Sequence, residues 1–167
     1  VGCGSGSMLS VLANFGEVLG VDDNDAALNF ARQNGFSNVM RIDDGCLSKQ
    51  SNFRNSFDLV TCLDVMEHID DDELLLKDVF QILKPGGIID YSTCTHSPEE
   101  NEEVLDFAIT KLNMKIENIN LPISCRKGIK TWQGRTYNNQ IQKSCRIFPQ
   151  DTNTDGFFIA KLVKEWK

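Results

Sequence analysis

The feature that most restricts the fold of this chain is the glycine-rich loop Gly2-Cys3-Gly4-Ser5-Gly6, which stands directly before a segment with helical apolar spacing. Glycine lets a backbone turn tightly and approach a ligand, and the start of a helix offers unpaired N–H groups. Asp22 ends the next apolar stretch, about 20 residues further on, where an acid can accept hydrogen bonds from ribose hydroxyls. This order predicts a cofactor site on a Rossmann-like fold. No Gly-Lys-Ser/Thr sequence follows the loop, which disfavours a P-loop.

Alternating helical and strand patterns predict an α/β fold with a mainly parallel sheet. Apolar periodicity predicts helices at 7–14 and near 27–31, and acids at 70–73 open a third helix that Lys84-Pro85-Gly86-Gly87 ends. Ser97-Pro98-Glu99-Glu100 is typical of a capping box with proline at the first helical position. Apolar, β-rich runs predict strands at 17–22, 39–42, 57–63, 88–93, 114–119 and 156–163.

The length of 167 residues predicts one domain, 1–167, with two halves that differ in charge. Acids outnumber Lys and Arg in 1–87, which we interpret as the cofactor-binding half. The second half, 88–167, contains a long polar and basic segment at 121–150 and is interpreted as the substrate half. A glycine loop of this kind normally follows a central strand, and only Val1 precedes it here, so we expect the first strand to be largely missing.

Composition excludes several classes of protein. The net charge of -7 argues against non-specific binding of nucleic acid. No apolar run reaches the roughly 20 residues of a membrane span, so no membrane partner is expected. The six cysteines form no C-x-x-C pair and the chain has two histidines, so we expect no metal site. Scattered cysteines predict reduced thiols and a cytoplasmic location.

Four segments of the first half, VGCGSGS, LGVDDN, FDLVTCLDVMEHI and ILKPGG, resemble the consecutive motifs of class I S-adenosylmethionine-dependent methyltransferases. The resemblance covers residues 1–87 and implies a Rossmann-like methyltransferase fold with S-adenosylmethionine as the cofactor. It implies that the loop glycines line the methionine moiety, that Asp22 holds the ribose, with Asp23 as the neighbouring candidate, and that Asp44 lies near the adenine. The implied cofactor-binding residues are Gly2, Gly4, Gly6, Asp22, Asp23, Asp44, Leu63 and Asp64.

From Ile88 onward the resemblance changes to another family. Tyr91-Ser92-Thr93-Cys94-Thr95 and the following Ser97-Pro98-Glu99-Glu100-Asn101-Glu102 look like the YSTCS…EENE motif of Sun-type RNA cytosine-5 methyltransferases. Arg146-Ile147-Phe148-Pro149 and Gly156 to Lys161 look like the C-terminal signature of that family. This resemblance implies that the chain methylates C5 of cytosine in RNA, either tRNA or rRNA.

The same resemblance makes Cys94 the candidate nucleophile. C5 of cytosine is a poor nucleophile, but a thiolate that adds to C6 makes C5 enamine-like and able to accept a methyl group. Such catalysis needs an accessible thiol with a lowered pKa. Cys94 is predicted at the carboxyl end of a strand, the edge at which open α/β sheets bind ligands. Asp64, predicted at the end of a neighbouring strand, would assist proton transfer.

The basic segment supplies candidate contacts to the RNA. Cations can pair with phosphates, and Trp132 and Tyr137 offer faces on which single-stranded bases stack. The target base would have to leave its stack to reach Cys94. The predicted substrate-binding residues are Arg126, Lys127, Lys130, Trp132, Arg135 and Arg146.

The sequence departs from the Sun-type pattern in the stretch after the fourth predicted strand. That family has a second essential cysteine in a D-A-P-C motif, where it helps to expel the product, whereas this chain has Asp64-Val65-Met66-Glu67. The glycine loop also differs from the A-x-P-G-G-K-T form usual there. The chain is thus interpreted as a hybrid, and slow turnover or a trapped protein–RNA adduct is predicted.

Two other hypotheses stay open. If the first half sets the substrate, the chain is a small-molecule methyltransferase, Cys94 is incidental, and His68 faces the substrate. Alternatively, the chain is a non-catalytic fragment that binds the cofactor or RNA without turnover. Retention of RNA and binding of S-adenosylmethionine distinguish these hypotheses.

Overall fold

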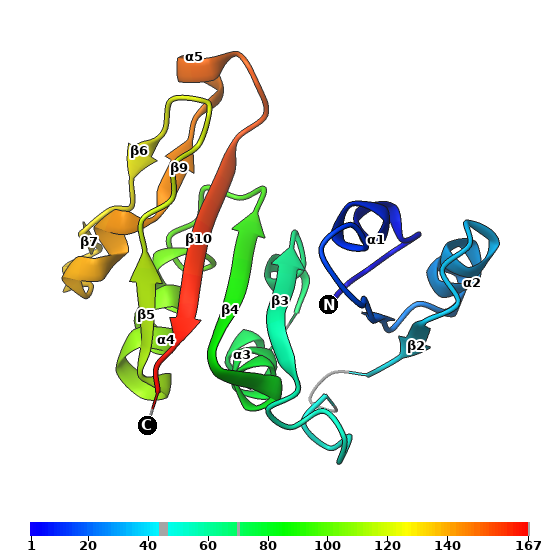
Figure 1. Cartoon of the computed structure of the whole chain (residues 1–167). Helices are drawn as coiled ribbons and strands as arrows, with labels where there is room; N and C mark the ends of the chain where they lie inside the picture. Colours follow the sequence, from blue (N-terminus) through cyan, green and yellow to red (C-terminus); the bar gives the residue numbers. More distant parts are fainter. Residues whose placement is uncertain (44–46, 70, 167) are drawn as a thin grey trace.

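A computed structural model describes residues 1–43, 47–69 and 71–166. In this part of the chain, six strands form one sheet in the order β3-β4-β10-β9-β6, with β5 pairing with β10 beside β9 (Figure 1). The long central strands are β4 (Leu83–Thr93) and β10 (Phe157–Lys164). The other strands of this sheet are β3 (Phe57–Leu63), β5 (Met114–Glu117), β6 (Arg126–Lys127) and β9 (Cys145–Ile147).

The strand directions confirm the α/β class and show where the parallel arrangement is interrupted. β3 and β4 are parallel, as are β1 (Gly20–Asp22) and β2 (Val39–Arg41), which form a separate pair. β10 is antiparallel to both β4 and β5, so β4 and β5 run in the same direction with β10 inserted between them. The sheet is therefore mixed: β3, β4 and β5 run in one direction, and β10, β9 and β6 pair antiparallel.

Residues 1–3 lie between the β1–β2 pair and the large sheet. The amino group of Val1 donates to the carbonyl of Thr61 in β3 at 2.8 Å. The backbone N–H of Cys3 donates to the carbonyl of Val21 in β1 at 3.0 Å. These bonds place the start of the glycine loop at the junction of β1 and β3.

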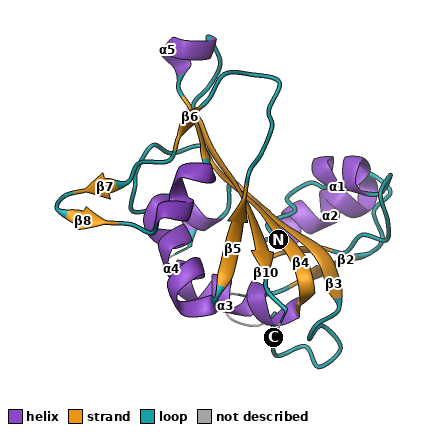
Figure 2. Ribbon diagram, turned by 60° about the vertical axis from the view of Figure 1, so that its left-hand side comes forward, coloured by secondary structure: helices purple, strands orange, loops and turns teal. Residues whose placement is uncertain are grey.

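Helices flank the strands, and two of them begin at side-chain caps. α2 (Asp25–Gln33) is capped by Asn24, whose side chain accepts from two backbone N–H groups, and α3 (Asp72–Ile82) is capped by Asp71, which accepts from the N–H of Leu74. α3 and α4 (Glu102–Leu112) pack on each other and contact β4 and β5, respectively (Figure 2). α1 (Ser7–Leu12) and α2 lie at the other end of the molecule with β2 (Figure 1).

The apolar faces of these elements form a main core and a smaller one. Leu76 and Val79 of α3 and Leu105 of α4 are buried with Tyr91 of β4 and Phe158 of β10. The smaller cluster joins α1, α2 and β2 through Leu9, Leu28, Ala31 and Val39. Full burial of such side chains stabilises the fold by about 1.5–3 kcal/mol each.

Several predicted boundaries differ from the structure, two of them at local sequence signals. α3 ends at Ile82, before Lys84-Pro85-Gly86-Gly87 as predicted, but β4 begins at Leu83 instead of Ile88 and includes this segment. The predicted capping box does not start α4: Ser97 donates its hydroxyl proton to the Glu99 carboxylate, and the helix begins at Glu102. In both places, long-range pairing or a side-chain contact replaces the local signal.

The segment 121–150 is more structured than its polar composition predicts. It holds β6 and β9, the hairpin of β7 (Thr131–Trp132) and β8 (Arg135–Thr136), and the 3-10 helix η2 (Asn139–Lys143). A short helix, α5 (Pro149–Thr152), follows. Buried Tyr137 and Ile141 anchor the segment 121–150 to the main core. Among the described helices, none has the length and apolar character that a bilayer crossing requires.

Candidate functional site

The glycine loop has backbone angles that favour glycine. Gly2, Gly4 and Gly6 have φ of 65°, 52° and 86°, in the left-handed region. A Cβ atom on Gly2 would stand 2.3 Å from Cγ2 of Val65, so a side chain there would also clash. Gly6 is buried and caps α1, and it does not line the two cavities described below. The loop thus brings Gly2 and Gly4 to the site, and Gly6 turns the chain.

The carboxylate of Asp22 is held by the loop that it faces. One oxygen accepts from the N–H of Gly4 at 2.7 Å, and the other accepts from the N–H of Asn24 at 2.9 Å. Each carboxylate oxygen can accept a further hydrogen bond. Asp22 is therefore preoriented at the end of β1 with acceptor capacity left for a ligand.

Two adjoining cavities lie along this edge of the sheet. One, of about 260 Å³, is lined by Gly2, Asp22, Asp23 and Asp64, and Asp43 follows β2 at its wall. The second, of about 480 Å³, shares Gly2 and Asp64 and adds Gly4, Leu63 and Ser92 to its lining. Acids beside a glycine cradle, next to apolar Val21 and Ile42, fit a nucleoside with ribose hydroxyls and a flat base. Asp44 lies outside the described residues.

Asp64 marks the point where both cavities meet the ends of the strands. It follows β3 with a φ of 53°, and its N–H donates to the carbonyl of Ser92 in β4 at 2.9 Å. Burial raises the pKa of Asp64, the charge of Glu67 raises it further, and His68 acts in the opposite direction. A carboxyl with a raised pKa exchanges protons more readily near neutral pH.

Cys94 follows β4 and is exposed, as the sequence predicts, but its electrostatics differ from the prediction. Oε1 of Glu67 accepts from the Cys94 N–H at 3.2 Å and lies 3.5 Å from its Sγ. The hydrogen bond to Glu67, burial and the charges of Glu67 and Asp64 raise the pKa of the Cys94 thiol. A lowered pKa was expected, so that expectation was wrong, because a carboxylate instead of a cation faces the sulfur. Donor atoms of Asp64, Glu67 and Cys94 lie within 4.8 Å of one another.

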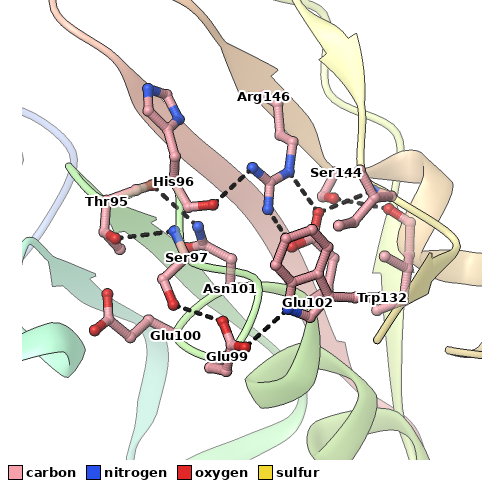
Figure 3. Close-up of polar contacts among 12 residues, drawn as sticks. Thr95, His96, Ser97, Glu99, Glu100, Asn101, Glu102, Trp132, Ser144 and Arg146 are labelled. Carbon is pink, nitrogen blue, oxygen red and sulfur yellow. Dashed lines mark hydrogen bonds and ion pairs between the residues drawn. The ribbon is translucent and has the colours of Figure 1, made fainter. Parts of the chain in front are cut away.

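A network of buried polar groups holds the loop that follows Cys94 (Figure 3). Thr93 donates to the side-chain oxygen of Asn101 at 2.5 Å, and the Asn101 amide donates to the carbonyl of Thr95 at 3.0 Å. Arg146 donates to the carbonyl of His96 at 3.1 Å and to both carboxylate oxygens of Glu102.

Arg146 is therefore not a surface residue. Its side chain is 4% exposed and that of Glu102 is 0% exposed. The sequence placed Arg146 among the substrate contacts, and the structure corrects this: its guanidinium is used in fixing the Cys94 loop. The EENE and RIFP segments are thereby joined across the fold.

The other predicted substrate contacts lie on the surface, and they differ in whether their side chains already have partners within the chain. Arg126 pairs with Asp151 at 2.7 Å, Arg135 pairs with Glu103, and the Trp132 N–H donates to Glu99 at 2.8 Å. Lys127 and Lys130 are exposed and have no ion pair within the described part of the chain. Tyr137 is buried, which removes it as a stacking face.

One surface feature was missed by sequence reasoning. The ring of His96, two residues after Cys94, stacks on Phe148 with centroids 4.8 Å apart, and the Arg126 guanidinium lies 5.0 Å from the Phe148 centroid. No local pattern predicts this contact, because the groups come from three separate segments of the chain. Glu67 was noted only as the residue in place of a cysteine, and its contact with Cys94 was not foreseen.

Residues 1–89 match the protein family described as methyltransferase domain. A tRNA (cytosine(49)-C(5))-methyltransferase of Pyrococcus abyssi is 44% identical over 90 residues, which are 54% of this chain and 29% of that protein. A ubiquinone biosynthesis O-methyltransferase of Idiomarina loihiensis is 37% identical over 97 residues, which are 56% of this chain and 40% of that protein. The chain thus spans well under half the length of either relative.

Most of the fold also has a counterpart among solved structures. A methyltransferase homologue protein from Pyrococcus horikoshii superposes with a TM-score of 0.73 at 26% identity, covering 92% of this chain and 55% of that chain. The two resemblances found in the sequence are thereby confirmed as similarities to known proteins of two kinds.

Proposed function

Because this chain belongs to the S-adenosylmethionine-dependent methyltransferases, we propose that it methylates C5 of cytosine in RNA through a covalent adduct at Cys94. The observation that carries the proposal is the position of Cys94. β3 and β4 pair in parallel with Leu63 opposite Ser92, so Asp64 and Cys94 leave the same edge of the sheet. Asp64 lines both cavities of the cofactor edge, and its donor atom lies within 4.8 Å of that of Cys94.

The cofactor is assigned to the two adjoining cavities. Gly2 and Gly4 would face its methionine part, and Asp22, with Asp23 beside it, would accept hydrogen bonds from the ribose. Asp43 lines the wall where the adenine is expected, and it precedes Asp44 in the sequence. When bound, S-adenosylmethionine supplies an electrophilic methyl group. Leu63 and Asp64 would border the point of transfer.

Two side chains carry the proposed chemistry on the base. The Cys94 sulfur adds to C6 of cytosine, which raises electron density at C5. Asp64 takes the C5 proton after methylation, and its raised pKa suits a group that must accept a proton. The S–C6 bond then breaks and the ring regains its aromaticity.

We further propose that the basic segment contacts the RNA backbone. Lys127 and Lys130 are exposed and form no ion pair in the described ranges, and Arg126, Trp132 and Arg135 lie on the same polar segment. The tRNA-modifying relative supports an RNA substrate. The described cysteines are all free thiols, which supports a reducing compartment such as the cytoplasm. We propose one domain whose halves, 1–87 and 88–167, bind cofactor and substrate.

The test is incubation of the protein with a pool of unmodified tRNA transcripts and S-adenosylmethionine, followed by SDS gel electrophoresis. We expect an SDS-resistant protein–RNA band that Cys94→Ala abolishes and Cys125→Ala leaves intact, since Cys125 is a second exposed thiol. A band that persists in Cys94→Ala would contradict the role given to Cys94.

A second candidate, methylation of a small molecule, is favoured by the O-methyltransferase relative. His68, which lines the cofactor cavity, would then face the substrate. Methyl transfer to a phenol, with no RNA-dependent band and no effect of Cys94→Ala, would support this function over the first.

A further inference from the structure

We propose that Glu67 is the proton acceptor for Cys94, taking the thiol proton as the sulfur adds to the base and returning it when the sulfur leaves. This inference rests on the proposed function, because it concerns the reaction of Cys94 with cytosine. It assigns a catalytic role to Glu67, a residue noted in the sequence only because it stands where the Sun-type family has its second cysteine.

The contact is built by the topology of the sheet. Glu67 lies in η1 (Met66–His68), the short 3-10 helix that follows β3, and Cys94 follows β4. Because β3 and β4 are parallel neighbours, the segments after both strands emerge at one edge. Oε1 of Glu67 is held by the Cys94 N–H at 3.2 Å, which directs it at the Sγ, 3.5 Å away. The acceptor is thus fixed by the same residue whose proton it would take.

Within the described part of the chain, the second carboxylate oxygen of Glu67 makes no hydrogen bond that would stabilise the fold. Oε2 of Glu67 is buried and has no hydrogen-bond partner among the described residues. In the same part of the chain no Lys or Arg pairs with Glu67, in contrast to Glu102, whose two carboxylate oxygens both accept from Arg146 and one of which also accepts from the N–H of Ile129. A buried carboxylate oxygen without a donor is costly, and such groups are often retained for chemistry.

The protonation state of Cys94 shows why an acceptor is needed. The hydrogen bond to Glu67 raises the pKa of the thiol, so the sulfur is protonated at neutral pH. Neutral thiols are weak nucleophiles, and an adjacent base can activate them at the moment of attack. Glu67 therefore suppresses the resting thiolate and at the same time supplies the base.

The proposed step balances without another reactant. In the forward direction, the S–H bond breaks, the sulfur bonds to C6 and the proton moves to Oε1 of Glu67. After C5 has gained its methyl group, the C5 proton moves to Asp64 and the S–C6 bond breaks. Glu67 then returns its proton to the departing thiolate and Asp64 releases the C5 proton to solvent, so Cys94 and both acids end as they began.

Two measurements on Glu67→Gln test this role. The first is the rate of formation of the Cys94–RNA adduct with the tRNA transcript pool, measured from pH 6 to pH 10. We expect a loss of about 100-fold at pH 7, the contribution of a positioned general base. The loss should shrink as the pH rises, because preformed thiolate needs no base. Glu73→Gln, an exposed acid on α3, is the matched control and should react like the wild type.

The second measurement uses no RNA. Alkylation of Cys94 by iodoacetamide, followed by mass spectrometry of its peptide, gives the pH at which the thiol ionises. Glu67→Gln removes the carboxylate that raises this pKa, so the midpoint should move down. A variant that reacts faster with iodoacetamide and more slowly with RNA cannot be explained by misfolding, which would not produce opposite changes.

The outcomes separate the two proposals. If the wild type forms no Cys94-dependent adduct, the proposed function fails and this inference fails with it. If the wild type forms the adduct and Glu67→Gln forms it at the same rate at pH 7, only the inference is overturned. Loss of the adduct on adding EDTA would also overturn it, because an ion would then join the two groups in place of a proton.

Discussion

Glu102 and Arg146, 44 residues apart in sequence, form a buried two-pronged ion pair beneath the loop that carries Cys94. The third guanidinium contact, to the carbonyl of His96, ties this pair directly to that loop. Glu102 begins α4 and Arg146 lies in β9, so the pair also joins the helical layer to the basic segment.

Replacement of one partner of this pair should lower the free energy of unfolding. We expect Arg146→Met to lower the free energy of unfolding by about 3–5 kcal/mol, because it leaves the Glu102 carboxylate buried and unpaired. Urea denaturation followed by circular dichroism measures this change. Arg126→Met, which breaks the exposed pair with Asp151, is the control and should cost no more than about 1 kcal/mol. Equal losses in the two variants would contradict the structural role of Arg146.

The glycine loop gives a second prediction. Gly2→Ala places a methyl group against Val65 at a positive φ, which we expect to cost about 1–3 kcal/mol of stability from backbone strain alone. It should also weaken the binding of S-adenosylmethionine, since Gly2 lines both cavities. Isothermal titration calorimetry checks this, with Gly16→Ala as the control, because a Cβ atom there would have no atom of the described residues within 4 Å beyond its chain neighbours. Unchanged affinity in Gly2→Ala would place the cofactor elsewhere.

Alkaline pH should destabilise the protein through Cys145. Burial first, and then its interaction with Cys125, raises the pKa of Cys145 from 9.0 to about 12. A group with a raised native pKa favours the folded state below its unfolded pKa, and this contribution is lost as the pH rises towards the native value. The free energy of unfolding should therefore fall between about pH 9 and about pH 12. Cys145→Ala should show a shallower decline in a series of urea titrations across this pH range, and a decline as steep as that of the wild type would contradict the prediction.

Lys127 and Lys130, the lysines proposed to contact RNA, give a test through the salt dependence of binding. If Lys127 and Lys130 each contact one phosphate of single-stranded RNA, the double change to alanine should reduce the slope of log K against log salt by about 1.4, roughly 0.7 per contact. Filter binding at several salt concentrations measures the slope. Lys111→Ala, an exposed lysine at the end of α4, is the control and should leave it unchanged. An unaltered slope in the double variant would exclude both lysines from the interface.

The sequence by itself determined the local elements and the order of motifs. The strand at Phe57–Leu63 was predicted with the bounds that the structure gives, because a continuous apolar run needs no distant information. The glycine loop, Asp22 at a strand end and Cys94 after β4 were also predictable, because turn chemistry and spacing are local properties. These features were sufficient to predict the α/β fold and the methyltransferase resemblance.

Only the tertiary structure decided which of these groups meet. Glu67 lies 27 residues from Cys94 in sequence, and their contact follows from the parallel pairing of β3 with β4. Arg146 was predicted as a surface cation, yet packing against α4 buries it. Both outcomes depend on register and burial, which set the dielectric surroundings and the neighbouring charges of a group. A lowered thiol pKa was therefore predicted for Cys94 and a raised one found, because the sequence cannot show which charge faces a sulfur across two strands.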